Sequence, residues 1–376
     1  MIKTKVSAPT AAHALLSLVT IKLSLMRKYL IIAPSWVGDM VMSQSLYRFL
    51  KSQDPNCIID IAAPKHCCEL AQFMPEINQD FELEFKHGQF GFNARKQKAL
   101  EFKGKGYTDA IVLPNSWKSA LIPFFARIKK RTGWHGEMRF VLLNDRRKLN
   151  KAKYPLMIER FCALGIAKKE HLPAKLPYPK FNVDRHLVET TLAKYRLTKD
   201  KPIIALCPGA EFGPAKKWPS AYYTELAQYL LDQNYQVLLL GGTKDQQTTS
   251  DISKGCNHHA HLFNLAGKTT LPEAVYLLAS CQRVISNDSG LMHIACALNI
   301  PTLVIYGSTS DKFTPPLNTL AKSVYLDDLE CRPCFKRECP LGHMDCMNKL
   351  LPQRIIAELE KLPLSLPTSY SHNPDY

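Results

Sequence analysis

Short apolar runs alternate along this chain with longer segments in which apolar residues recur at helical spacing. The predicted strands lie at 30–33, 57–63, 110–113, 203–206, 236–240, 283–286 and 302–306. The predicted helices lie at 39–51, 117–127, 156–164, 220–233, 248–254, 272–279, 289–298 and 353–361. This alternation is typical of parallel strands joined by helical crossovers. The pattern therefore predicts an α/β protein with two doubly wound halves.

The alternation loosens after residue 148, which is where we expect the two halves to join. The run 172–180 holds three Pro in nine residues, and such a run forms neither a helix nor a central strand. We therefore predict an N-terminal domain at 26–171, a linker at 172–182 and a C-terminal domain at 183–362. Ligands of open parallel sheets bind beyond the carboxyl ends of the strands, so the predicted site is the cleft between the domains.

The two ends of the chain lie outside the predicted domains. Residues 1–25 contain an apolar stretch flanked by Lys, but His13 interrupts it and it is shorter than the roughly 20 apolar residues of a membrane span. No small-residue cleavage site of a secretory signal follows it. Because Met26 directly precedes the first strand, we expect 1–25 to be an extension or a misassigned start, and 363–376 to be a tail.

Composition and charge narrow the classes of partner. A hydrophobic fraction of 46% and a charged fraction of 22% over 376 residues exclude a disordered, collagenous or coiled-coil chain. The net charge of +16 favours polyanionic partners, which are nucleic acids, anionic membranes or phosphorylated substrates. Most of the 12 Cys are scattered through apolar or helical surroundings, so we expect a reducing compartment and a cytoplasmic protein.

The loop at 34–39 follows the first predicted strand. Gly38 allows a tight turn, and Asp39 stands at the start of the next predicted helix. An Asp here is either an N-cap, worth about 1 kcal/mol, or a general base that faces the cleft. The loop is not a dinucleotide fingerprint, because the chain contains no G-x-G-x-x-G.

The loop at 207–219 follows the first strand of the second half. Gly209 and Gly213 let the backbone approach a ligand closely. Lys216 and Lys217 stand beside the start of the following helix. There they either bind a phosphate group or are solvated surface lysines.

A third strand end carries the sequence Ser-Asn-Asp-Ser-Gly-Leu-Met-His. Either Asn287 or Asp288 can cap the helix that starts here. At Ser289 and Gly290 the free N–H groups of the first turn form an anion site. His293 lies one turn into the helix, where it either reaches the same ligand or is a core histidine.

Four cysteines cluster near the end of the second half, in the loop 331–346. They are Cys331, Cys334, Cys339 and Cys346, with His343 among them. The first spacing fits a metal knuckle, whereas the remaining spacings are irregular for a zinc site. Structural zinc, a metal-free packed loop and a redox disulfide are the three interpretations.

Several of these motifs occur together, and in this order, in one known enzyme family. They are Ala33-Pro-Ser-Trp-Val-Gly-Asp39, Arg131-Thr-Gly-Trp134, Pro208-Gly-Ala-Glu-Phe-Gly-Pro-Ala-Lys216, Asn287-Asp-Ser-Gly290 with His293, and Cys331-Arg-Pro-Cys-Phe-Lys-Arg-Glu-Cys-Pro-Leu-Gly-His343. From about 26 to 361 the chain resembles the ADP-heptose–lipopolysaccharide heptosyltransferases of glycosyltransferase family 9, and in particular those of type II. The resemblance implies the GT-B fold, in which two Rossmann-like domains face each other across a cleft.

The resemblance also implies a reaction. Such enzymes move L-glycero-D-manno-heptose from ADP-heptose onto the first heptose of the lipopolysaccharide inner core. The transfer inverts the anomeric centre and uses neither a metal ion nor another cofactor. It takes place on the cytoplasmic face of the inner membrane, to which the chain is expected to bind peripherally.

By this resemblance, the strand-end loops hold the catalytic and donor-binding residues. Asp39 matches the family's proposed base, and Lys216 matches its lysine near the phosphates. The predicted donor-binding residues are Gly209, Lys216, Lys244, Asp288, Ser289, Gly290 and His293. Asp288 matches the position that holds hydroxyls of the donor sugar. Lys244 follows a strand and is expected to meet the nucleoside, although related enzymes have an acidic residue near it.

Other functions stay open on the sequence. The rival enzymes are heptosyltransferase I and an enzyme that adds a third heptose, and the Glu211-Phe-Gly-Pro stretch and the loop 331–346 favour type II over type I. Charge alone suggests a nucleic-acid-binding protein, but no such motif is present. A further alternative is a peripheral membrane protein anchored by 1–25. A set of basic residues either steers the acidic acceptor or forms a generally basic surface: Lys118, Arg127, Lys129, Lys130, Arg131 and Arg139.

Overall fold

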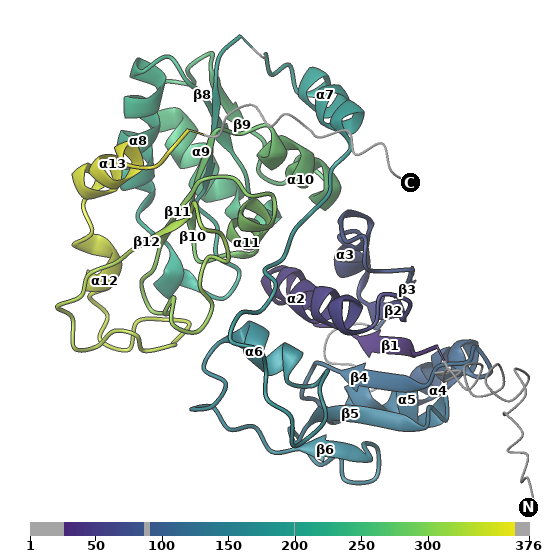
Figure 1. Ribbon diagram of the computed structural model, residues 1–376. Coiled ribbons are helices and arrows are strands. Elements are labelled where there is room, and N and C mark those ends of the chain that lie inside the picture. The colour runs from purple at the N-terminus through teal and green to yellow at the C-terminus, as the bar shows by residue number, and fades with distance from the viewer. Residues whose placement is uncertain (1–25, 86–90, 199, 365–376) are drawn as a thin grey trace, which may run out of the picture.

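Two six-stranded parallel sheets with helices packed beside them form the protein (Figure 1). The computed structural model describes residues 26–85, 91–198 and 200–364. The predicted extension at 1–25 and most of the predicted tail at 363–376 lie outside the described residues. The two sheets confirm the predicted α/β class with two doubly wound halves.

The sheet of the N-terminal half has the strand order β3-β2-β1-β4-β5-β6, and all neighbouring strands are parallel. Its strands are β1 (Lys28–Ile32), β2 (Ile58–Ala63), β3 (Gln79–Glu82), β4 (Asp109–Val112), β5 (Lys130–Trp134) and β6 (Asp145–Arg147). Its α-helices are α2 (Val37–Gln53), α3 (Lys65–Cys68), α4 (Phe92–Phe102), α5 (Leu121–Phe125) and α6 (Met157–Cys162), with 3-10 turns η1 (Ala71–Phe73) and η2 (Trp117–Ala120). The order reverses between β1 and β4, so the loop after β1 opens at a topological switch point, where ligands of such sheets bind.

The sheet of the C-terminal half has the order β12-β11-β10-β7-β8-β9 and is also parallel throughout. Its strands are β7 (Ile203–Cys207), β8 (Gln236–Leu239), β9 (Leu262–Asn264), β10 (Arg283–Asn287), β11 (Thr302–Ile305) and β12 (Lys322–Val324). Its helices are α7 (Arg185–Lys194), α8 (Ser220–Asp232), α9 (Gln246–Gly255), α10 (Leu271–Ala279), α11 (Gly290–Ala297), α12 (Asp345–Asn348) and α13 (Pro352–Glu360), with 3-10 turns η3 (Pro214–Lys216) and η4 (Thr243–Asp245). Here the order reverses between β7 and β10, so the loops after these two strands share one switch point.

The two halves pack against each other along α2 and α11, which lie face to face in the middle of Figure 1. One hydrophobic core continues across this contact, because buried side chains of both helices belong to the same cluster. The residues predicted as the linker have neither helix nor strand, and they run between the halves. Phe181 stacks on Phe73 of the N-terminal half with ring centroids 5.6 Å apart, and Phe73 meets Tyr276 of the C-terminal half at 5.4 Å.

The predicted elements differ from the observed ones in specific ways. The helix predicted at 39–51 starts two residues earlier, at Val37, and the helix predicted at 117–127 is η2 followed by the short α5. The pattern missed the helices α3, α4, α7 and α12 and the strands β3, β5, β6, β9 and β12. Of these strands, β3, β6, β9 and β12 lie at the edges of their sheets, where polar residues interrupt the apolar run. Among the described helices, none combines the length and the apolar character that crossing a bilayer requires.

Candidate active site between the two halves

A cavity of about 1100 Å³ lies between the halves, at the carboxyl ends of both sheets. From the N-terminal half it is lined by residues that include Trp36, Gly38, Asp39, Asn115, Lys118 and Trp134. From the C-terminal half its lining includes Gly209, Glu211, Gly242, Asp245, Ser289 and Gly290. This volume is large enough for a nucleotide-linked donor together with part of an acceptor. The predicted cleft between two domains is therefore present.

Asp39 is on the cavity wall, and it does not cap the helix that contains it. The cap position of α2 belongs to Trp36, and no side chain caps this helix, so the N-cap interpretation of Asp39 is wrong. Asp39 is the third residue of α2, and its side chain is half-buried. Burial raises the pKa of the Asp39 carboxyl to about 6; nearby Lys216 opposes this rise and Asp288 adds to it. A carboxylate with a pKa this close to neutrality is suited to accept a proton.

Lys216 and Asp288 form an ion pair directly behind the cavity wall. Lys216 Nζ lies 2.6 Å from Asp288 Oδ2, and both side chains are largely buried. The hydroxyl of Thr309 donates to the same carboxylate oxygen at 2.6 Å. The ammonium of Lys216 also lies 5.0 Å from the ring centroid of Phe212, which fixes the direction of its stem. The Asp288 carboxylate is thus satisfied within the protein, and the cation is held close to Asp39.

The N-terminus of α11 faces the cavity and meets the loop after β1. Ser289 is its cap and accepts from the backbone N–H of Met292 at 3.5 Å, so the predicted caps Asn287 and Asp288 are wrong. The amide of Asn287 is used elsewhere, since it donates to the carbonyl of Pro208 at 2.7 Å and thereby ties the loop after β7 to β10. The free N–H groups of the α11 first turn remain available to an anion.

Two glycines permit this close approach of the halves. A Cβ on Gly290 would lie 2.8 Å from Val37 Cβ, and a Cβ on Gly38 would lie 2.8 Å from His293 Cδ2. His293 is therefore packed behind Gly38 rather than on the cavity wall. Its burial lowers the pKa of the imidazole to about 4, so the ring is neutral at physiological pH. Any contribution of His293 to an anion site comes from a hydrogen bond and not from a charge.

Asp245 is a site residue that sequence reasoning missed. Its carboxylate occupies the space beside Gly209, where a Cβ would come within 2.3 Å of Oδ2. The backbone N–H of Gly242 donates to it at 3.1 Å, and Lys217 Nζ lies 3.3 Å away. The predicted Lys244 instead pairs with Glu211 at the exposed rim, and it is absent from the residues that line the cavity. The sequence did contain a signal for Asp245. The family resemblance implies an acidic residue near position 244, and Asp245 is the next residue.

The part of the cavity wall that belongs to the N-terminal half contains basic residues, of which the sequence identified Lys118 alone. Arg95 lines the cavity and packs over the Phe85 ring at 3.9 Å, and its burial lowers the pKa of its guanidinium. Arg160 lines the cavity as well. The prediction that Arg139 steers an acceptor from the surface is wrong, because Arg139 is completely buried. The charge pattern gave no sign of this burial, since the carbonyls that Arg139 binds belong to the backbone.

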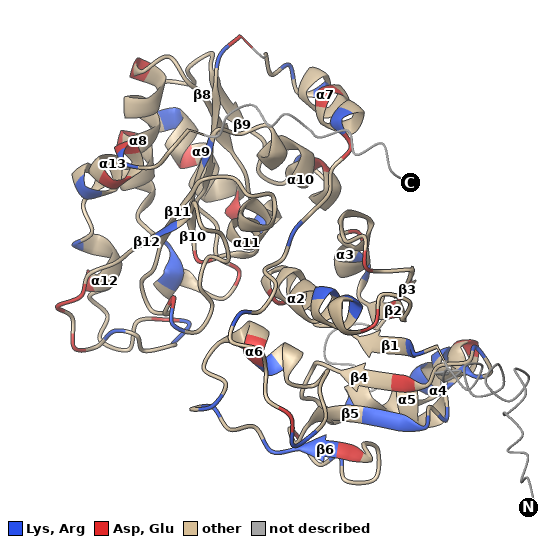
Figure 2. Ribbon diagram, in the orientation of Figure 1, with Lys and Arg blue, Asp and Glu red and all other residues tan. Residues whose placement is uncertain are grey.

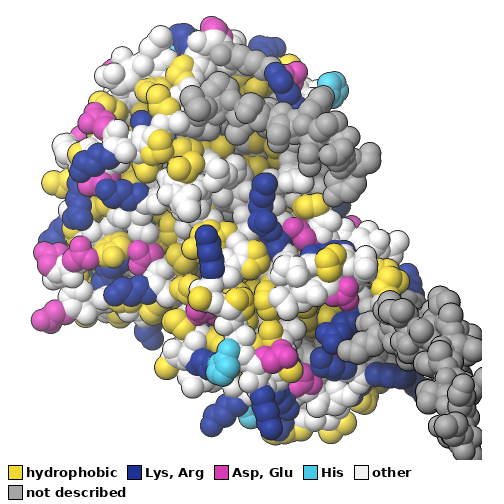
Figure 3. Space-filling view, in the orientation of Figure 1, with side chains coloured by type: hydrophobic (Ala, Val, Ile, Leu, Met, Phe, Trp, Pro, Cys, Tyr) yellow, Lys and Arg dark blue, Asp and Glu magenta, His cyan; other side chains and the backbone are white. Residues whose placement is uncertain are grey.

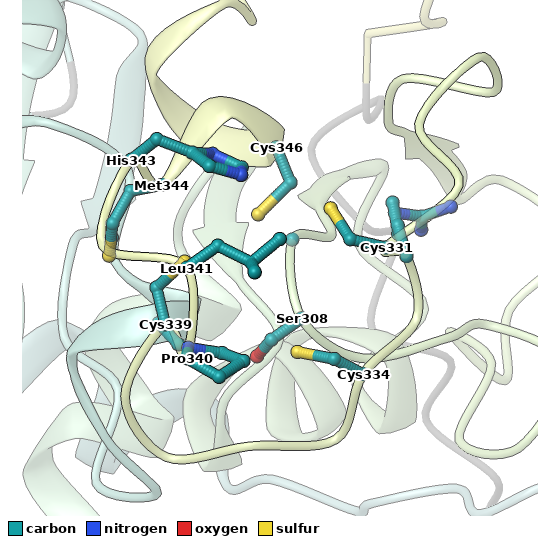
Figure 4. A pocket seen from close by; sticks show the side chains of 12 residues that line it. Ser308, Cys331, Cys334, Cys339, Pro340, Leu341, His343, Met344 and Cys346 are labelled. Carbon is teal, nitrogen blue, oxygen red and sulfur yellow. The ribbon is translucent and has the colours of Figure 1, made fainter.

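The four clustered cysteines line a small cavity of about 30 Å³ on the C-terminal half, away from the cleft. Figure 4 shows their sulfur atoms around the side chain of Leu341. All four are free thiols. Among the described residues, no three His, Cys, Asp or Glu side chains are arranged to hold a metal ion. Backbone N–H groups that include those of Met344, Leu341 and Gly342 lower the pKa of the Cys339 thiol.

Comparisons with known proteins place this geometry in a family. The model of glycosyltransferase family 9 (heptosyltransferase) matches residues 95–345. Lipopolysaccharide heptosyltransferase 2 of Escherichia coli is 44% identical over 344 residues, which cover 90% of this chain and 99% of that protein. Lipooligosaccharide heptosyltransferase 2 of Haemophilus ducreyi is also 44% identical, over 89% of this chain and 99% of its own.

A solved structure supports the same relationship at the level of the fold. The structure of E. coli ADP-heptose lipopolysaccharide heptosyltransferase II superposes with a TM-score of 0.81 and 43% sequence identity, covering 89% of this chain and 97% of that one. The predicted GT-B arrangement is therefore confirmed. The chain belongs to glycosyltransferase family 9, the heptosyltransferases, and within it to the lipopolysaccharide heptosyltransferase 2 group.

Proposed function

We propose that this protein transfers L-glycero-D-manno-heptose from ADP-heptose onto the first heptose of the lipopolysaccharide inner core. The donor and the acceptor class come from the names of the relatives, which are ADP-heptose lipopolysaccharide heptosyltransferases. The observation that carries the chemistry is Asp39, a half-buried carboxyl with a pKa near 6 that faces the N-terminus of α11 and the buried Lys216.

In this proposal the reaction is one displacement. The Asp39 carboxylate takes the proton of the acceptor hydroxyl as its oxygen attacks the anomeric carbon of the donor heptose. The bond from that carbon to the β-phosphate breaks, and ADP leaves with the electron pair. Because a single attack comes from the face opposite the leaving group, the configuration at the anomeric carbon inverts.

Negative charge accumulates on the diphosphate during this step. Lys216, Lys217 and the free N–H groups at the start of α11 lie on the donor side and supply the positive field that stabilises it. These groups do the work that a divalent cation does in other transferases, so we propose a metal-independent reaction. Asp288 holds Lys216 in place through their ion pair, and Asp245, beside Gly209 and Gly242, binds the nucleoside.

The two domains divide the substrates between them. The domain at 26–171 binds the acceptor through the wall that contains Arg95, Lys118 and Arg160, whose charges match an acidic glycolipid. The domain at 183–362 binds ADP-heptose. Since the acceptor is a membrane glycolipid, we place the enzyme peripherally on the cytoplasmic face of the inner membrane.

Single-turnover transfer onto purified mono-heptosylated acceptor tests this function, with wild type beside Asp39→Ala and with ADP-heptose binding measured in parallel. We expect wild-type transfer, a loss of about 100- to 10,000-fold in the variant, and nearly unchanged donor binding. Transfer that survives the substitution would contradict the role of Asp39. Activity on the unheptosylated acceptor alone would instead identify a heptosyltransferase I.

A further inference from the structure

The loop that joins β5 to β6, residues 135–144, exposes a compact group of large apolar side chains. Met138 and Val141 are each 76% exposed, more than any other large apolar side chain in the described part of the chain, and Phe140 is 57% exposed. A folded protein commonly exposes single apolar side chains, but a contiguous group of them marks an interaction site. The proposed catalytic mechanism makes no use of these three side chains.

Contacts with the backbone of neighbouring residues hold the loop in this conformation. Arg139 is completely buried between the exposed residues, where it donates to the carbonyl of Pro114 at 2.7 Å and to the carbonyl of Trp134. Gly136 has φ +50°, and a Cβ there would lie 2.3 Å from the carbonyl oxygen of Asn115. Because these contacts fix the backbone against the sheet, the outward direction of the apolar side chains is part of the fold.

The loop lies within the most basic segment of the chain. Residues 127–153 contain ten Lys and Arg against two Asp and Glu, a net charge of +8 that makes up half of the chain's +16. Figure 2 shows this basic character on β5 and β6, and in Figure 3 apolar and basic side chains lie side by side at the lower end of the view. Arg146 lies 4.1 Å from the Phe140 ring centroid. Exposed cations of the segment include Arg127, Lys129, Lys148, Lys151 and Lys153.

The loop also adjoins the mouth of the cleft on its acceptor side. The backbone N–H of Glu137 donates to the carbonyl of Asn115 at 3.0 Å, and the carboxylate of Glu137 accepts from the N–H of Trp117 at 2.7 Å. Asn115 and Trp134 both line the cavity. A surface that contacts the loop is therefore next to the place where an acceptor enters.

We propose that the loop 135–144 docks this protein on an anionic lipid bilayer. Met138, Phe140 and Val141 insert into the boundary between headgroups and acyl chains, while the surrounding cations contact the headgroups. The charge argues against a second copy as the occupant, because two segments of +8 would repel each other when placed face to face. The proposal rests on the proposed function only in that a membrane glycolipid acceptor supplies the reason for docking.

Vesicle sedimentation tests the docking surface directly. The probe is vesicles of phosphatidylglycerol and phosphatidylethanolamine, compared with vesicles of phosphatidylcholine alone. The variant Met138→Ser/Phe140→Ser/Val141→Ser is expected to lower the partition coefficient at least about tenfold. A matched control, Leu100→Ser/Leu187→Ser/Leu351→Ser, removes three exposed apolar side chains elsewhere and is expected to bind like wild type.

Charge and depth of insertion are measured separately. Replacing Lys129, Lys148 and Lys151 by Gln is expected to weaken binding to the anionic vesicles by roughly fivefold for each Lys removed. A Phe140→Trp variant places a Trp at the point of insertion. Its Trp emission is expected to shift to the blue when anionic vesicles are added, by more than the emission of the wild type does. Unchanged sedimentation of the triple Ser variant, or no emission shift, would overturn the proposal. So would a wild-type dimer that the Ser variant dissociates without any vesicle binding, because the loop would then be an interface between copies.

Transfer assays separate this inference from the proposed function. We expect the triple Ser variant to keep wild-type transfer onto a deacylated, water-soluble acceptor and to lose transfer onto the acylated acceptor in vesicles. Equal loss on both acceptors would overturn docking as the role of the loop. If wild type transfers to neither acceptor, the proposed function fails, and the sedimentation result still decides the docking surface.

Discussion

Two aspartates near the cleft, one from each half, differ in what surrounds them. Asp288 is almost fully buried, but Lys216 and Thr309 each contact its Oδ2 at 2.6 Å. Asp39 is less buried, yet burial dominates its environment and raises its pKa to about 6. The comparison shows that partial burial is enough to raise the pKa of a carboxyl, and that a more deeply buried carboxyl can be held by an ion pair and a hydrogen bond instead.

Removing Asp288 is expected to give the largest change in stability. Asp288→Ala leaves the ammonium of Lys216 largely buried without its carboxylate, and losing one partner of a buried pair costs about 3–5 kcal/mol. Urea unfolding measures this loss. Glu211→Ala is the matched control, since it breaks an exposed ion pair worth about 0–1 kcal/mol. Equal losses in the two variants would show that the Lys216–Asp288 pair is not a structural unit.

Asp39→Asn is expected to act in the opposite direction and to stabilise the protein at neutral pH. The pKa of Asp39 is raised in the folded state, so between about pH 4 and pH 6 the folded state binds more protons than the unfolded state. Stability from this group is therefore present below that window and is lost as the pH rises through it. We expect the variant to exceed wild type by up to about 3 kcal/mol at pH 8 and to match it at pH 4. A variant that is equally or less stable at pH 8 would contradict the raised pKa.

Adding a methyl group at the contact between the two halves is expected to have a smaller effect on stability than the two Asp substitutions. Gly38→Ala or Gly290→Ala places a methyl group 2.8 Å from His293 or Val37, and such overpacking costs about 1–3 kcal/mol. We expect lower unfolding free energies and weaker ADP-heptose binding, because the two helix N-termini are pushed apart. Gly242→Ala is the control for the unfolding free energy, as its Cβ would come no closer than 4.0 Å to another residue. The contact is not needed for the site if both variants bind the donor like wild type.

Lys244→Ala is expected to have the smallest effect. Lys244 is 74% exposed and pairs with Glu211 at the rim, so the structure favours a change in donor affinity below about twofold. Calorimetric titration with ADP-heptose measures it. A loss of tenfold or more would restore Lys244 as a nucleoside contact and would show that the rim closes on the donor.

The sequence predicted the interior of each half better than its edges. The strand β7, Ile-Ile-Ala-Leu-Cys, is buried along its whole length, so its apolar run is sufficient to reveal it. The edge strands β3 and β6, Gln-Asp-Phe-Glu and Asp-Arg-Arg, carry charges and are held by ladder hydrogen bonds to one neighbour. Such pairing depends on the rest of the sheet and leaves no local pattern.

For the candidate site, position in the fold was predictable and environment was not. The loops after β1, β7 and β10 were identified because strand ends meet at the switch points. The start of α2 was misplaced, since its cap position is held by Trp36, which is not a capping residue. The burial of Arg139 and the place of Asp245 beside Gly209 arise from residues distant in sequence, and local pattern does not record such contacts.

The measurement that tests Asp39 as the base most directly is the pH dependence of single-turnover transfer with saturating donor and a deacylated acceptor. Activity is expected to fall as the pH drops through about 6, because protonation of the Asp39 carboxylate removes the base. Asp39→Asn is expected to leave a residual rate without this limb. A wild-type limb near pH 4, or a limb near pH 6 that persists in Asp39→Asn, would contradict the assignment of Asp39 as the base.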